Sequence, residues 1–531
     1  MIKDLFFTYK FIKHNKKIFI PQKKNKNKIL VDFFEYKPSM LVFSYLSNIL
    51  AEKYDAEIIL SKCDYGNKGF KSILKSIFQK IFFLSNWNIF KSFGAKKIIY
   101  TNFYTLDNSI TKKIYNKIIK KIKKKSDVLK IKINKVDIGD LIYDDYLREK
   151  RCTTIDVNNK DFRKHLLRMV KLFIFWEDYI KNNEIKACLI SHSVYKFGII
   201  ARIAIHKNIK VIYSGVGCTY SLDKKNKLSN VGYSDYPKTF KILQHQIKKN
   251  LYKIAKKELE KKLMGKIDMT QIINQAQKFK SFSRIKNNKK IIKKINTPPT
   301  ILVAAHCFTD AVHAFDKTLF SDFHDWLDFL GKISNKTKYK WLIKLHPADF
   351  DANLRFIDYF IKKYPKFILV EKYVTHNSIL EKNIIAVLTV NGSIGHEYPL
   401  FGIPVVNAHP TGSNPHCAYN FNLNPKNIRE LKKIILNIEK VKFKINYKLR
   451  QEIYEYYYTR VFADYSFLPG HKKVYIKLRD KVSTAKIFDE WLKLFNLNLH
   501  ELQKKNYLNF VQSNNYRMIA DNTKKIPTII L

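Results

Sequence analysis

Three small or polar residues, Asn391-Gly392-Ser393, stand between an apolar run and a short helical pattern. Residues 384–390 predict a buried parallel strand, and the helix after the turn should carry His396 and Glu397. The first N–H groups of a helix have no partner inside the helix, so a strand, a small turn and a helix start form a natural anion site. Ser393 adds a hydroxyl, and the arrangement suits a phosphorylated ligand that carries a ribose. An ordinary strand-to-helix turn of an α/β domain is the alternative interpretation.

Two histidines follow other predicted strands in the same half of the chain. His306 follows the apolar run 301–305, and His346 with Pro347 follows the run 340–344. In open α/β sheets, ligands bind beyond the carboxyl ends of the strands, which share one edge. We therefore expect both histidines to join the Asn-Gly-Ser turn at one site. A purely structural hydrogen-bonding role is the alternative for each histidine taken alone.

The first half of the chain offers candidates for acid–base chemistry at the matching edge. Glu35 follows the predicted strand 29–34, and His192 follows the strand 187–191. A general base removes the proton of an attacking hydroxyl, so Glu35 and His192 are candidates for that role. A retaining reaction would need no such base.

The sequence predicts a mechanism without a metal ion. No HExxH, paired-acid or Walker pattern occurs in a convincing context. Asp144-Asp145 follows an Ile-Tyr pair instead of a strand that would present a metal, so it receives no ligand role. Negative charge on a leaving group would instead be neutralised by histidine, lysine and helix N-terminal N–H groups. No cofactor is expected.

Strand and helix patterns alternate in both halves of the chain, which predicts an α/β fold. We expect two Rossmann-like, doubly wound parallel-sheet domains that face a cleft, with a helical C-terminal segment. Between the halves, strand signals vanish in a lysine-rich stretch that ends at Thr297-Pro298-Pro299-Thr300. The expected divisions are 1–235, a helical linker region at 236–297, a second sheet domain at 298–445, and helices with a polar tail at 446–531.

The formal net charge of +54 attracts polyanions, such as phosphorylated substrates, anionic lipids or nucleic acid. The basic residues are mainly lysines spread along the chain, which favours a solvated surface over a nucleic-acid site. Residues 111–125 place isoleucines at helical spacing among lysines, a pattern typical of helices on anionic bilayers. A surface helix that packs its isoleucines on the sheet is the alternative.

The six cysteines are widely separated and form no CxxC pair, which fits a reducing compartment. The first twenty residues mix lysine with Phe and Ile and lack a clean apolar core of a signal peptide. No run of about 18 uncharged apolar residues occurs. We expect a cytoplasmic protein, with peripheral association with the inner membrane as an open alternative.

The second half resembles glycosyltransferases of capsule and surface polysaccharides that have the GT-B architecture. The resemblance rests on Lys344-Leu-His346-Pro347, on Asn391-Gly-Ser393-Ile-Gly-His-Glu397 and on Gly402-Ile-Pro404. These segments are similar to motifs of bacterial Kdo transferases, sialyl- and polysialyltransferases, and CDP-glycerol glycerophosphotransferases. The resemblance implies that His346 and Ser393 meet donor phosphate and that Glu397 lies near the ribose. It covers about residues 300 to 410 well.

The resemblance implies an enzyme that moves a sugar from a nucleotide-activated donor, such as CMP-Kdo or a CMP-linked sialic-acid-like sugar. The acceptor would be a surface polysaccharide or a lipid-linked glycan. Residues 1–235 would then form the acceptor side and 298–445 the donor side. A CDP-glycerol-type polyol-phosphate transferase is one alternative, and a non-enzymatic basic scaffold or nucleic-acid-binding protein is another. The candidate catalytic residues are His346, Glu35 and His192, and the candidate donor-binding residues are His306, Pro347, Asn391, Gly392, Ser393, His396, Glu397 and Gly402.

Overall fold

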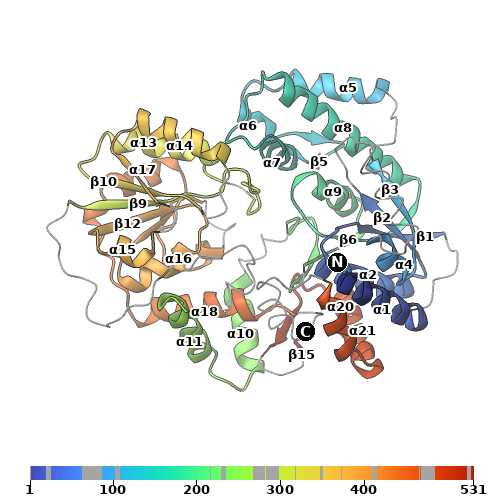
Figure 1. Ribbon diagram of the computed structural model, residues 1–531. Helices are drawn as coiled ribbons and strands as arrows, with labels where there is room; N and C mark the ends of the chain where they lie inside the picture. Colours follow the sequence, from blue (N-terminus) through green and yellow to red (C-terminus); the bar gives the residue numbers. More distant parts are fainter. Residues whose placement is uncertain are drawn as a thin grey trace.

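Two α/β domains lie side by side in the computed structural model of the chain, each built on its own sheet (Figure 1). The predicted fold class is thereby confirmed. The structure describes residues 2–19, 26–62, 86–101, 108–215, 217–228, 235–266, 282, 298–316, 318–346, 351–371, 374–409, 415–465, 467, 485–522 and 528–530.

The first sheet has six strands in the order β3-β2-β1-β6-β7-β8. The first five are parallel, and β8 runs antiparallel to β7. The order reverses direction between β1 and β6, which is the topological switch point of a Rossmann-type sheet. The bounds are β1 Asn27–Asp32, β2 Glu57–Lys62, β3 Ala95–Tyr100, β6 Glu184–Ile190, β7 Lys210–Ser214 and β8 Thr219–Leu222.

Helices cover both faces of this sheet because successive side chains of a strand point to opposite faces. Ile29 and Val31 of β1 share one buried cluster with the first helices of the chain, whereas Leu30 joins the cluster of the other face. The long helix α8 buries Leu166, Phe173 and further apolar residues. The helices are α1 Ile2–Ile18, α2 Lys37–Tyr54, α4 Asn86–Lys91, α5 Asn108–Ile119, α6 Lys125–Val128, α7 Gly139–Lys150, α8 Lys160–Lys181, η2 Tyr195–Phe197 and α9 Gly198–His206, and a small hairpin pairs β4 Lys132–Ile133 with β5 Val136–Asp137.

The second sheet has five parallel strands in the order β11-β10-β9-β12-β13, with its switch point between β9 and β12. This order matches the first five strands of the first sheet. Its strands are β9 Thr300–Ala304, β10 Lys340–Lys344, β11 Phe367–Val370, β12 Ile384–Thr389 and β13 Val405–Asn407. Its helices are α13 Phe323–Ser334, α14 Asp351–Lys363, α15 His376–Leu380, α16 Ile394–Glu397, η4 Tyr398–Phe401, η5 Pro415–Ala418, α17 Ile428–Leu436 and η6 Ile438–Lys440.

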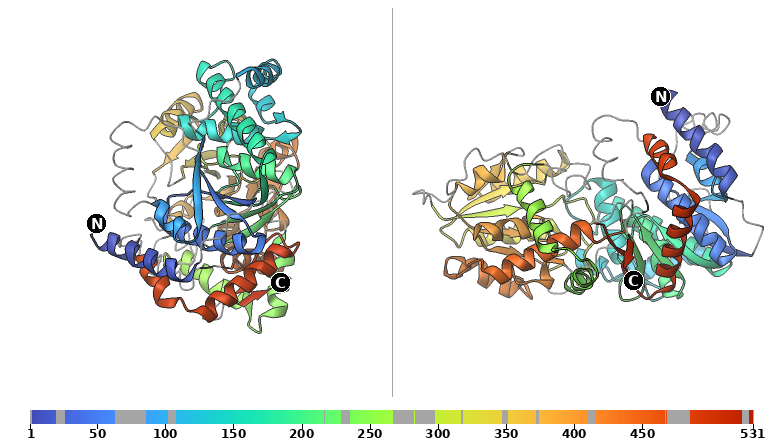
Figure 2. Two further views of the ribbon diagram at one scale, coloured as in Figure 1. Left: turned by 90° about the vertical axis from the view of Figure 1, so that its right-hand side faces the viewer. Right: turned by 90° about the horizontal axis from the view of Figure 1, so that it is seen from below.

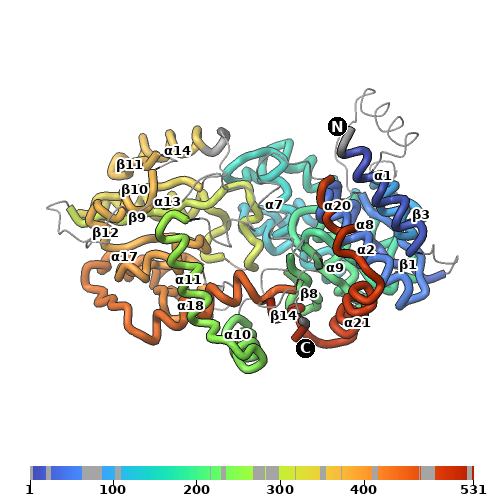
Figure 3. Tube along the Cα trace, turned by 60° about the horizontal axis from the view of Figure 1, so that its bottom comes forward, coloured from blue at the N-terminus to red at the C-terminus, as the bar shows by residue number. Residues whose placement is uncertain are grey.

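Three helices connect the two sheet domains: α10 Tyr236–Gln246, α11 Leu251–Leu263 and α18 Tyr447–Phe462. They pack on one another, with α11 and α10 both against α18, and share a buried aromatic cluster (Figure 3). The chain therefore crosses between the domains twice, once before and once after the second sheet.

The C-terminal segment returns to the first domain, where its helices lie beside α1 and α2 (Figure 2). Phe488 of α20 Lys486–Leu494 stacks on Phe11 with ring centroids 4.5 Å apart. Helix α21 Leu497–Gln512 contacts α2. The tail was expected to be polar, but it also contains an antiparallel pair, β14 Ile519–Asp521 and β15 Thr528–Ile530. Within the described residues no helix is long and apolar enough to cross a membrane.

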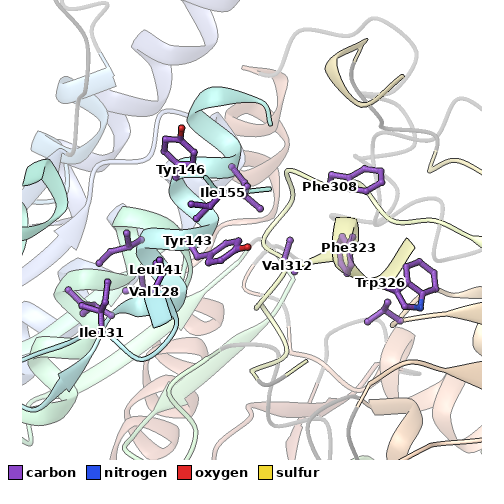
Figure 4. Close-up of a cluster of buried hydrophobic side chains, with 14 of the residues drawn as sticks. Val128, Ile131, Leu141, Tyr143, Tyr146, Ile155, Phe308, Val312, Phe323 and Trp326 are labelled. Atoms are coloured by element: carbon purple, nitrogen blue, oxygen red, sulfur yellow. The ribbon is translucent and has the colours of Figure 1, made fainter. Parts of the chain in front are cut away.

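The two domains also meet directly, at the start of α13 (Figure 4). Asp322 caps α13 and has a fully buried side chain. From the first domain, Tyr143 donates a hydrogen bond of 2.5 Å and Thr154 one of 2.6 Å to Asp322 Oδ2. Lys125 Nζ lies 3.0 Å from the same oxygen. A buried carboxylate with three donors from the other domain ties the two domains to each other.

Candidate functional site

The candidate residues gather at the carboxyl edges of the two sheets. His306 follows β9 and the Asn391–Ser393 turn follows β12, so both lie at the switch point of the second sheet. His192 follows β6 at the switch point of the first sheet. In doubly wound sheets this is the position where ligands bind.

His306 organises the turn after β12. Its Nε2 atom lies 3.2 Å from both the Val390 and Asn391 backbone nitrogens, which donate to it, and 3.1 Å from Thr389 Oγ1. A nitrogen that accepts N–H groups carries no proton, so the ring is the neutral Nδ1–H tautomer. Burial, with the nearby His346 and His409, lowers the pKa of His306 to about 3. His306 therefore acts on the turn as a neutral acceptor and holds its shape.

The turn itself is compact and partly open to solvent. A Cβ at Gly392 would lie 2.8 Å from Thr389 Oγ1, so only glycine fits there without displacement. Ser393 is exposed and Asn391 is half-buried, so both side chains can reach a ligand. Helix α16 after the turn has only four residues, so its dipole is small and the predicted anion attraction would depend mainly on side chains.

His346 lies at the end of β10, two strands from β12, and is half-buried. The His346 ring lies near His306, because a charge on His346 lowers the pKa of His306. The preceding Lys344 donates a 2.8 Å hydrogen bond to the Val374 carbonyl, and this bond fixes the end of the strand. Pro347, the other predicted residue of this motif, lies outside the described residues.

His396 and Glu397 lie beneath the turn, each only 1% exposed. Glu397 Oε1 lies 2.7 Å from Lys262 Nζ of α11. Burial alone would raise the pKa of Glu397, but Lys262 and His376 outweigh it and the pKa is lowered. Burial, with the charge of Lys262, holds the pKa of His396 far below its usual range. As the structure stands, neither side chain is open to solvent, and the Glu397 carboxylate accepts a hydrogen bond from the Ser393 side chain.

The backbone conformation at position 402 explains why this residue is glycine. It ends η4 with a φ of +77°, a conformation that side chains other than glycine rarely adopt. The chain then enters β13. Gly402 therefore shapes the path between the turn and the next strand.

On the first domain, His192 is part of a hydrogen-bonded chain that begins at Asp32. The Ser191 hydroxyl lies 2.9 Å from Asp32 Oδ2 and 2.9 Å from His192 Nδ1, and the Ser191 N–H donates to the same Asp32 oxygen at 2.8 Å. Burial raises the pKa of Asp32 to about 6, against hydrogen bonds from Ser191 and Ser61. Burial and the charge of Arg148 lower the pKa of His192 to about 4.

Sequence reasoning missed Asp32, although a signal was present. Asp32 is the last residue of β1, an apolar strand that lies at the switch point. A carboxylate at the buried end of such a strand needs donors, and here neighbouring strand ends supply them. Glu35, the predicted alternative, is 47% exposed and forms a 2.6 Å ion pair with Lys62. Asp32 is buried and has a raised pKa, which are the properties that acid–base chemistry needs.

The two carboxyl edges meet at Tyr195 and Asp310. The Tyr195 hydroxyl, from the first domain, donates a 2.9 Å hydrogen bond to Asp310 Oδ1, from the loop after β9. The Arg148 guanidinium lies 4.4 Å from the centre of the Tyr195 ring. Both Arg148 and Asp310 act on the charge of His192. A cation, a carboxylate and the Asp32 chain thus converge where the two domains face each other.

Two groups of described residues have the composition of a metal site: Asp145 with Glu149 and His165, and Asp322 with His324 and Asp325. Neither group contains a predicted site residue. The Asp322 carboxylate is already occupied by donors of the first domain.

No protein-family model and no curated protein sequence matches this chain. Similar solved structures include a UDP-GlcNAc 2-epimerase from Neisseria meningitidis bound to UDP-GlcNAc, with 11% identity, coverage of 86% of this chain and 100% of that chain, and a TM-score of 0.23. The β-Kdo 2,7 transferase KpsC from Thermosulfurimonas dismutans has 11% identity, coverage of 59% and 95%, and a TM-score of 0.29. A glycosyltransferase from Rickettsia africae has 11% identity, coverage of 86% and 99%, and a TM-score of 0.28. The fold is defined by the strand orders of the two sheets described above.

Proposed function

We propose that this protein is a glycosyltransferase of GT-B type that uses a nucleotide-activated sugar, with a CMP-linked sugar such as CMP-Kdo or a sialic-acid-like sugar as donor. The acceptor would be a surface polysaccharide or a lipid-linked glycan. The observation that carries the proposal is the meeting of two Rossmann-type switch points through Tyr195 and Asp310. One edge offers a small-residue turn for a donor, and the other offers an acid–base chain for an acceptor.

On the donor side, Ser393 and His346 are the groups that the motif resemblance assigns to phosphate. Both side chains have solvent access, as this role requires. His306 would hold the shape of the turn while the outward-facing side chains bind the donor. Glu397, which the resemblance places near the ribose, would support the turn from below through Lys262 unless donor binding rearranges this pair.

On the acceptor side, we assign the general base to the Asp32–Ser191–His192 chain. If Ser191 donates to Asp32, its oxygen accepts the proton of His192 Nδ1, and His192 Nε2 keeps a lone pair for the acceptor hydroxyl. Asp32 would then stabilise the imidazolium through Ser191 as the proton arrives. The anionic nucleotide leaves on the opposite side, where histidine and lysine side chains neutralise its charge.

The direct test is incubation with CMP-Kdo, CMP-sialic acid, CDP-glycerol and UDP-sugars while nucleotide release is measured. Release of CMP that depends on a glycan acceptor would support the proposal. Turnover with CDP-glycerol, with phosphate retained in the product, would identify the polyol-phosphate alternative. Failure to bind or turn over any activated donor, together with nucleic-acid binding that weakens steeply with salt, would favour the non-enzymatic alternative.

A further inference from the structure

A cavity of about 490 Å³ lies on the first domain between the end of α5, helix α6 and the β4–β5 hairpin. Its volume falls within the range of small-ligand sites. None of the residues that line it belongs to the candidate functional site. The lining includes Ile114, Ile118, Ile122, Lys117, Lys121 and Asp127.

The floor of the cavity is apolar. Ile114, Ile118 and Ile122 recur every fourth residue, so they form one stripe along the helix and the turn after it. Ile118 and Ile122 are buried and Ile114 is half-buried, because α5 packs on α8. Ile110 continues the stripe outward and is 52% exposed. The stripe is therefore partly covered by the protein, and the uncovered part leads from the cavity to the surface.

The rim of the cavity is basic. It carries four lysines and a single carboxylate, Asp127. The Asp127 carboxylate already has partners within the protein, because it accepts hydrogen bonds from the Lys123 and Lys124 backbone N–H groups and lies 3.4 Å from Lys130 Nζ. Lys117 and Lys121 are exposed, and among the described residues no acidic side chain forms an ion pair with either of them. An anion at this rim would therefore meet little competition from the protein's own carboxylates.

We infer that this cavity binds an anionic lipid of a bilayer surface, with the phosphate between Lys117 and Lys121 and the start of the acyl chain on the isoleucine floor. Lysines near an anionic bilayer gain attraction, and the apolar floor gains by losing contact with water. A free phosphate would use only the rim. The site would hold the first domain against a bilayer independently of the donor chemistry.

The test uses flotation of the full chain with vesicles of phosphatidylcholine alone and with 30% phosphatidylglycerol, at physiological salt, which screens distant charges. We expect binding to the anionic vesicles only. Lys117→Glu with Lys121→Glu should weaken this binding roughly tenfold or more, given the attraction of each lysine to such a surface. Monomeric dihexanoyl phosphatidic acid should compete, whereas inorganic phosphate at the same concentration should not.

The matched control is Lys112→Glu with Lys113→Glu. Both double variants replace two lysines by glutamates, so the change in net charge is identical. Lys112 and Lys113 are exposed and lie on the same helix, but they do not line the cavity. We expect this variant to bind within about threefold of the wild type, since the remaining long-range attraction is screened. Equal losses in both variants would show general attraction to a basic helix and would overturn the site. Absence of wild-type binding, or competition by inorganic phosphate alone, would overturn the lipid assignment.

Discussion

Lys262 Nζ lies 2.7 Å from Glu397 Oε1, and the two side chains are only 7% and 2% exposed. Lys262 belongs to α11, one of the helices that connect the domains, whereas Glu397 ends the short helix after the donor-side turn. The ion pair thus links the connection between the domains to the proposed donor site. A buried pair of this kind is costly to break from one side, because the remaining charge loses its partner.

Lys262→Met tests this link. The change leaves Glu397 buried without its cation, so we expect the free energy of unfolding to fall by about 3–5 kcal/mol in urea titrations. The double variant Lys262→Met with Glu397→Gln removes both charges and should recover most of that loss. If the losses of stability of Lys262→Met and of Glu397→Gln, each measured alone, simply add in the double variant, the two residues are not coupled.

Asp32→Asn tests the proposed Asp32–Ser191–His192 chain, in which His192 takes the proton and Asp32 stabilises the imidazolium. The pKa of Asp32 is raised to about 6 from 3.8, so the folded protein keeps a proton that the unfolded chain loses in this window. The stability contribution of Asp32 therefore falls as the pH rises from 3.8 to about 6 and then stays constant, a total of about 3 kcal/mol. Asp32→Asn should lack this pH dependence in unfolding titrations and should lose at least a hundredfold in turnover, in the range expected for a general base.

The matched control for Asp32 is Glu35→Gln. Glu35 is exposed and paired with Lys62, so its loss should leave turnover within about threefold of the wild type. A rate that falls more for Glu35→Gln than for Asp32→Asn would restore Glu35 as the base.

The buried pair of Asp144 and His313 predicts a second pH dependence, at the contact between the domains. His313 Nδ1 lies 2.7 Å from Asp144 Oδ1 and Nε2 lies 3.1 Å from the Ser321 carbonyl, so both ring nitrogens face acceptors, an arrangement that favours the protonated ring. Burial alone would lower the pKa of His313, but Asp144 outweighs it and the pKa is raised. The stabilisation is full below the unfolded pKa of about 6.5 and is lost as the pH rises through the folded value.

Unfolding titrations between pH 5.5 and 9 check this prediction. The wild type should lose stability as the pH rises through the upper part of this range, and His313→Gln should lack that loss. Asp144→Asn should also lack that loss, because burial without the carboxylate favours the neutral imidazole. Parallel curves for the wild type and His313→Gln would contradict the cationic assignment.

His346→Ala and Ser393→Ala test the donor side. Both side chains are at least partly accessible to solvent, so we expect the free energy of unfolding to change by less than about 1 kcal/mol. Turnover should be abolished if these groups meet donor phosphate. His306→Ala is the informative contrast, because it removes the acceptor of two backbone N–H groups. We expect His306→Ala to destabilise the protein by about 2–3 kcal/mol. Unchanged turnover in both His346→Ala and Ser393→Ala would contradict the assignment of these two residues to the donor phosphate.

Regular elements were predicted well where the hydrophobic pattern is strong. The run 340–344 coincides with β10, and the run 384–390 extends one residue beyond β12. Short or irregular elements were missed, such as β8 and the final pair of strands, because three or four residues give no usable period.

The sequence by itself determined which residues end strands, since apolar runs and the polar residues after them follow from local chemistry. It therefore placed His306, the Asn-Gly-Ser turn and His192 at strand ends. Only the tertiary structure decided which strand ends are neighbours and which side chains lie below the surface. Burial in the folded sheet raises the pKa of Asp32 against hydrogen bonds from Ser61 of β2 and from Ser191, the residue after β6, and Glu397 meets a lysine 135 residues earlier in the chain. Such contacts depend on strand order and helix packing, which local periodicity does not encode.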